Sequence, residues 1–222
     1  MNQRRKFLLA SRLFFVVALL LEGCATRQLV PVLDSGKVDI DRRSVTQTDG
    51  DVTVTFAGSA WNSEPIWMEE VVTPLYAVIE NHGATPISFG YSDLLIFDEQ
   101  RVQYPALSPE TVAARVQALG QHYVAPPSPP LLIWGRPSFW YSPFWYDPWP
   151  PSYTYPRVNV SGVYAKALPV GSVRPQSRVQ GFIYFAPLPT TVERITVSLS
   201  YERSGEPIKH ERTFPFVIQK SR

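Results

Sequence analysis

A lone cysteine limits the ways in which this chain of 222 residues can be held together. Cys24 is the only cysteine, so no disulfide can form within the chain. It directly follows a stretch with four basic residues in its first twelve positions and an unbroken apolar run over residues 13–21. This order of basic, apolar and small residues is typical of a secretory signal peptide. A domain exported without disulfides depends on its hydrophobic core for stability.

The residues around Cys24 indicate which kind of signal this is. Leu21-Glu22-Gly23-Cys24 resembles the lipobox of bacterial lipoproteins, with Glu22 as its one departure from the usual small or apolar residues. The resemblance implies that residues 1–23 are removed and that Cys24 becomes acylated. The apolar run is far shorter than the ~20 residues of a membrane-spanning helix. Ala25 after the cysteine, where an Asp would imply inner-membrane retention, implies an outer-membrane lipoprotein facing the periplasm. The alternative is an ordinary cleaved signal with an incidental thiol.

The charge of the chain depends strongly on that signal. Residues 1–23 carry a net charge of +3, so the formal +2 of the whole chain becomes −1 for the remainder. No cluster of Lys and Arg remains that could neutralise a row of phosphates. We therefore expect no nucleic-acid partner, and we expect the membrane to be contacted through the lipid anchor.

The remainder divides into a tether and one domain. Residues 24–50 are polar and rich in turn-forming residues, which predicts a lipidated flexible tether. Residues 51–222 contain several segments in which apolar and polar residues alternate, a pattern that predicts strands with one buried face. These segments are 52–56, 75–80, 87–89, 94–97, 101–104, 179–185, 195–201, 208–213 and 214–218. Asp98-Glu99-Gln100 is expected to be a solvated hairpin connection.

One helix is expected within this domain. Ser108 is a suitable N-cap and is followed by proline, which favours the first helical position. Val112, Val116 and Leu119 would form its buried face, and Gly120 would end it. Many short strands with one short helix predict a mainly β protein, an antiparallel β-sandwich of two sheets.

Two segments resemble telokin-like, immunoglobulin-fold domains of bacterial lipoproteins. The first runs Val78-Ile79-Glu80-Asn81-His82-Gly83-Ala84-Thr85-Pro86-Ile87. The second is Leu168-Pro169-Val170-Gly171 followed by the glycine-aromatic strand of residues 179–185. The resemblance implies an immunoglobulin-like sandwich that serves as an interaction module of the envelope, and it implies no catalytic residues.

A long insertion rich in proline and aromatic residues spans residues 125–157. It contains ten prolines and four of the six tryptophans of the chain. Proline fixes φ and removes a backbone donor, so this segment is predicted to be neither a helix nor a central strand. Its rings represent on the order of 2,000 Å² of surface, whereas soluble monomers rarely expose apolar patches beyond about 600 Å². The rings must therefore be covered.

Three coverings are open: the insertion packs on its own domain, contacts lipid headgroups, or binds a partner. The partner would be an envelope protein or a glycan such as peptidoglycan or lipopolysaccharide, because aromatic rings stack on sugars. The candidate contact residues are Trp134, Trp140, Tyr141, Trp145, Tyr146 and Trp149.

Motifs for catalysis or cofactor binding are missing from the sequence. His82, His122 and His210 are far apart, and no phosphate-binding loop, nucleophile elbow or zinc motif occurs. The adjacent pairs Glu69-Glu70 and Asp98-Glu99 are not suited to joint acid–base work, because strand neighbours point to opposite faces. We expect a non-enzymatic binding or structural protein without cofactor or metal.

Overall fold

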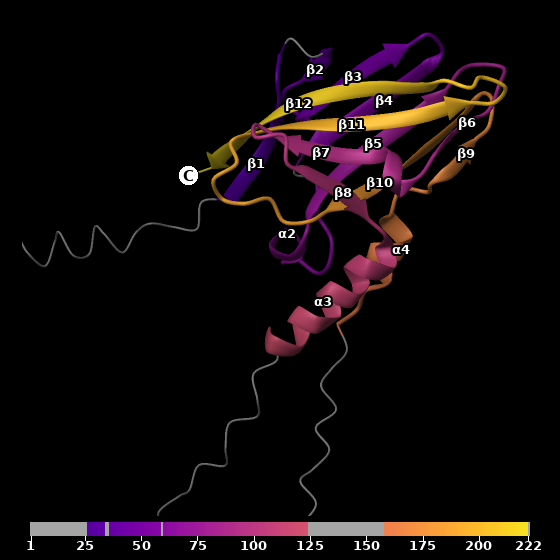
Figure 1. The fold of residues 1–222 in the computed structure, drawn as a ribbon. Coiled ribbons are helices and arrows are strands. Elements are labelled where there is room, and N and C mark those ends of the chain that lie inside the picture. The colour runs from indigo at the N-terminus through magenta and orange to yellow at the C-terminus, as the bar shows by residue number, and fades with distance from the viewer. Residues whose placement is uncertain (1–25, 34–35, 59, 124–157, 222) are drawn as a thin grey trace, which may run out of the picture.

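The computed structural model describes residues 26–33, 36–58, 60–123 and 158–221, which form a mainly β protein (Figure 1). The strands are β1 (Thr26–Pro31), β2 (Lys37–Asp39), β3 (Ser44–Asp49), β4 (Val52–Gly58), β5 (Thr73–Asn81), β6 (Ile87–Phe89), β7 (Leu94–Asp98), β8 (Gln103–Leu107), β9 (Gly171–Val173), β10 (Ser177–Phe185), β11 (Arg194–Arg203) and β12 (Lys209–Ser221). The helical segments are α2 (Met68–Val71), η1 (Tyr91–Asp93), α3 (Pro109–Tyr123) and α4 (Ser161–Lys166).

Ten of the strands form one continuous antiparallel order, β1-β12-β11-β7-β8-β10-β5-β4-β3-β2, and β6 pairs with both β11 and β9. The order folds into two layers that meet at β8. Leu95 of β7 lies opposite Pro105 of β8, whereas Tyr184 of β10 lies opposite Leu107 of the same strand. Strand β8 therefore leaves one sheet and joins the other. The predicted mainly β, antiparallel sandwich is confirmed.

The main core fills the space between the two layers. In β4 the side chains of Val52, Val54 and Phe56 are buried and alternate with threonines on the outer face. Phe56 meets Phe214 of β12 edge to face, with ring centroids 4.8 Å apart. This contact joins the two sheets through the kind of aromatic pair that adds about 0.5–1.5 kcal/mol to burial alone.

A second apolar cluster lies on the outer face of β5 and β10. Helices α2, α3 and α4 gather at one end of these strands (Figure 1), and Met68, Val116 and Val163 are fully buried there. Phe182 and Tyr184 of β10 point into this cluster, whereas Ile183 and Phe185 point into the main core. The second half of β10 is thus buried on both faces, as its continuous apolar run permits.

The predicted flexible tether over residues 24–50 is wrong where the structure describes it. Strand β1 pairs with β12, and β2 and β3 extend the other sheet from β4. Val45 is fully buried and Leu29 nearly so. The polar composition misled because every second side chain of β3 faces outward, where Thr46 bonds to Thr55 at 2.8 Å.

The predicted helix exists, but its end and its buried face differ from expectation. Val112 and Val116 are buried, whereas Leu119 is exposed. Gly120 does not end α3, which continues to Tyr123. A Cβ at this glycine would overlap the side chain of Val158, so the residue permits close packing.

Helices α2 and α4 were not predicted. Within the described residues, every helix is too short or too polar to span a bilayer.

Candidate functional site

All the residues predicted as contact or lipidation sites lie outside the described residues. These are Cys24 and the aromatic residues Trp134, Trp140, Tyr141, Trp145, Tyr146 and Trp149, within the 125–157 insertion. The structure therefore brings none of them together. It does fix the places at which the two segments join the fold.

The N-terminal segment joins the fold at β1. Thr26 is the first residue of this strand and lies opposite Ser221 of β12. Cys24 precedes Thr26 by two positions. Two extended residues reach about 7 Å at most. A group attached to Cys24 would therefore lie close to this end of the sandwich.

Both ends of the insertion join the helix layer. The segment leaves from the end of α3 and returns at Val158, just before α4. Val158 packs against the second apolar cluster together with Trp67, and Gly120 lets it approach α3. The helix layer is therefore the base from which the aromatic segment departs.

The helix layer has its own aromatic cluster, which sequence reasoning missed. The ring of Trp61 meets Phe182 edge to face at 5.0 Å, and its indole N–H donates to the carbonyl of Pro65 at 3.1 Å. The hydroxyl of Tyr184 donates to the carbonyl of Val163 at 3.1 Å, and burial raises the pKa of this tyrosine. The apolar run of residues 182–185 was the available signal, because a strand buried on both faces requires a covering layer.

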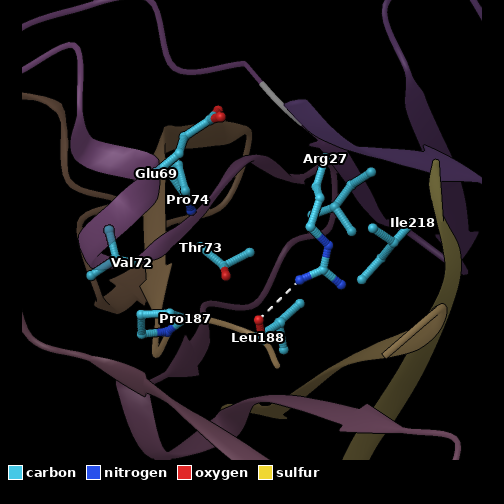
Figure 2. Close-up of a pocket in the computed structure, with 9 residues that line it drawn as sticks. Arg27, Glu69, Val72, Thr73, Pro74, Pro187, Leu188 and Ile218 are labelled. Carbon is cyan, nitrogen blue, oxygen red and sulfur yellow. Dashed lines mark hydrogen bonds between the residues drawn. The ribbon is translucent and has the colours of Figure 1, made fainter. Parts of the chain in front are cut away.

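An anchor-side cleft lies where β1 begins, between β12 and α2 (Figure 2). It is lined by Arg27, Leu29, Glu69, Val72, Thr73, Pro74, Pro187, Leu188 and Ile218. The Arg27 guanidinium donates to the carbonyls of Leu188 at 3.0 Å and Val192 at 2.7 Å. Partial burial raises the pKa of the Glu69 carboxyl, which Figure 2 shows pointing away from Arg27. At about 110 Å³ the cleft is smaller than the 300–1,000 Å³ typical of small-molecule sites.

A charged cluster stands at the other end of the sandwich, where β12 begins. Asp49 accepts a hydrogen bond from the Tyr201 hydroxyl at 2.7 Å and pairs with Arg212. Burial opposes ionisation of Asp49, but the hydrogen bonds from Tyr201 and Arg212 outweigh it and hold its pKa below the usual 3.8. The two ring nitrogens of His210 lie 3.5 Å from Asp49 and 2.9 Å from Glu206. This cluster ties the β3–β4 turn to β11 and β12.

The prediction that Asp98 is solvated in its hairpin is wrong. Asp98 is buried, and one carboxylate oxygen accepts the backbone N–H groups of Gln100 and Val102 at 2.9 and 2.8 Å. The other oxygen accepts the Tyr104 hydroxyl at 3.0 Å. Asp98 therefore shapes the β7–β8 connection.

In the described part of the chain, no three His, Cys, Asp or Glu side chains are grouped so that they could hold a metal ion.

No protein-family model matches the sequence, and no curated protein matches it either. Among solved structures, the chain is similar to MPT63, a secreted protein from Mycobacterium tuberculosis. The two are 10% identical, the match covers 80% of this chain and 91% of MPT63, and the TM-score is 0.28.

Proposed function

We propose that this chain is a lipid-anchored protein of the bacterial cell envelope with a non-enzymatic binding or structural role. The acylated Cys24 holds it at the membrane, and the aromatic segment 125–157 contacts an envelope partner. The outer membrane, with the domain facing the periplasm, is the expected location.

The lipid anchor is supported by the position of the lipobox-like segment relative to the fold. Leu21-Glu22-Gly23-Cys24 lies directly before the first strand, since β1 begins at Thr26. Cleavage before Cys24 would remove no strand of the described fold and would leave the new terminus beside it. Two or three acyl chains would suffice for stable attachment, because each buried methylene contributes ~0.8 kcal/mol and one chain alone is marginal.

The contact role is supported by where the aromatic segment departs. Both of its ends join the helix layer, which packs on the outer face of β5 and β10. We propose that a partner surface, protein or membrane, covers its ten rings.

The anchor is tested by changing Cys24→Ala in the full chain and fractionating cells. The protein should move from the membrane to the soluble fraction, because its acyl attachment atom is gone. A Ser35→Ala variant, changed beyond the lipobox, is the control and should stay with the membrane. Retention of the Cys24→Ala protein on membranes would contradict the lipid anchor.

A further inference from the structure

A second cleft lies on the outer face of the β5–β10 sheet, at the border of the helix layer. Its volume is about 460 Å³, within the range of small-molecule sites. It is lined by Ala60, Asn62, Tyr76, Ala165, Lys166, Gln180, Gly181 and Phe182. Sheet residues form its floor, and α4 with the segment after β4 forms its walls.

The floor combines an aromatic ring with polar groups that lack partners. The ring of Tyr76 meets Phe182 edge to face at 5.2 Å, which fixes its orientation on the sheet. Among the described residues, neither the Tyr76 hydroxyl nor the side-chain amide of Gln180 has a hydrogen-bond partner. A ligand on this floor would meet an aromatic surface flanked by unused donors and acceptors.

The wall of the cleft carries the ammonium group of Lys166, whose contacts are with a hydroxyl and an aromatic ring. The Lys166 ammonium contacts the Ser63 hydroxyl and lies 5.8 Å from the centre of the Trp61 ring. It forms no ion pair with any described residue, and the lining contains no carboxylate. The cleft is therefore suited to a neutral or anionic group and not to a cation.

The wall is fixed to the floor by backbone contacts. The Leu168 N–H donates to the carbonyl of Phe182 at 2.8 Å, directly after α4. A side chain on Gly181 would overlap the backbone of Ala167, so this glycine lets the wall lie against β10. A site held in this way loses little conformational entropy when it binds a ligand.

We propose that this cleft binds an acidic glycan. A sugar offers an apolar ring face for Tyr76, hydroxyl and amide groups for Gln180 and Asn62, and a carboxylate or phosphate for Lys166. The proposal names a ligand class for the binding role proposed above, but it uses only described residues and does not require the lipid anchor.

The test uses the full-length chain, purified in detergent, with soluble saccharides and calorimetry. One probe is the disaccharide of N-acetylglucosamine and N-acetylmuramic acid, which bears a carboxylate. A second is a deacylated glucosamine disaccharide phosphate. The third, diacetylchitobiose, is neutral. At least one acidic probe should bind about tenfold or more tightly than chitobiose, because a charge-assisted hydrogen bond is lost in the neutral sugar. Whichever acidic probe binds better identifies the acid as carboxylate or phosphate.

Variants then assign the binding to the cleft. Lys166→Gln should weaken binding of the acidic probe about tenfold and leave chitobiose unaffected. Gln180→Ala, at an exposed position, should weaken both. The matched control Lys37→Gln, on the exposed edge strand β2, should leave all affinities unchanged. Absence of binding, equal affinity for acidic and neutral probes, or no effect of Lys166→Gln would overturn the proposal. Cys24→Ala should not change these affinities, so failure of the anchor is separable from failure of the glycan site.

Discussion

Single buried polar residues hold the turns of this sandwich. Asn81, the last residue of β5, is almost fully buried. Its side-chain NH₂ lies 2.9–3.2 Å from the carbonyls of Thr85, Val173 and Arg174, which share its two hydrogens, and its oxygen accepts the Gly83 N–H at 3.0 Å. One amide thus joins the turn after β5 to the segment after β9.

Asn81→Ala should therefore lower the free energy of unfolding by about 3 kcal/mol, because it leaves buried backbone groups without partners. Urea denaturation followed by circular dichroism measures this loss. His82→Ala, in the same turn but largely exposed, is the control and should change stability by no more than about 0.5 kcal/mol. Equal effects of the two substitutions would show that the Asn81 bonds do not stabilise the fold.

Asp49 makes the stability of the fold depend on pH. Its pKa is lower in the folded chain than the usual 3.8. Its ionised form therefore contributes stability above pH 4, and this contribution is lost as the pH falls through the lower folded value. Unfolding free energies measured from pH 6 down to pH 2 should decline less steeply for Asp49→Asn than for the native chain. A variant curve parallel to the native one would contradict the assignment.

For the polar residues that hold the turns, the sequence predicted the turn itself but not the burial of the side chain. Asn81-His82-Gly83 was correctly expected to be a turn, because these residue types favour one. The burial of Asn81 and Asp98 was not expected. Their partners lie on segments that only the folded chain brings near, such as Val173 for Asn81.

Among the helices and strands, most strands were predicted from the alternation of apolar and polar residues. The alternation in β4 and β11 was correctly interpreted, because each has one face in the core and one outside. β3 was missed because Val45 is its only apolar residue, so the alternation that marks β4 is absent from it. Helices α2 and α4 were missed because they are short, with four and six residues, and owe their place to packing on α3 and on the outer face of the sheet.

The helix layer should remain folded without the aromatic segment, because Val158 at the return junction packs on described residues of this layer. Replacing residues 124–157 by a six-residue Gly-Ser linker should leave the unfolding midpoint nearly unchanged and should abolish the envelope contact. Trp61 and Trp67 would then be the only tryptophans, so their fluorescence reports directly on this layer. Crosslinking in intact cells reports on the contact.

Two outcomes of this deletion would oppose the proposed role. Unfolding of the shortened chain would indicate that the segment covers its own domain. Undiminished crosslinking would place the contact surface elsewhere on the molecule.

In the molecule as a whole, the first and last strands of the chain lie side by side at one edge of the antiparallel strand order. β1 pairs with the last six residues of β12, so both termini of the described fold lie together (Figure 1). If Cys24 is acylated, this end lies against the bilayer without a long tether. The charged cluster around Asp49 then lies at the far end, and the aromatic segment departs from one side.

If Cys24 is the lipid anchor of this sandwich, its sulfur must carry acyl groups. Intact mass spectrometry of the protein purified from its native membrane tests this modification. We expect a chain that begins at Cys24 and carries a diacylglyceryl group on its sulfur. A chain that retains residues 1–23 with an unmodified thiol would contradict this expectation.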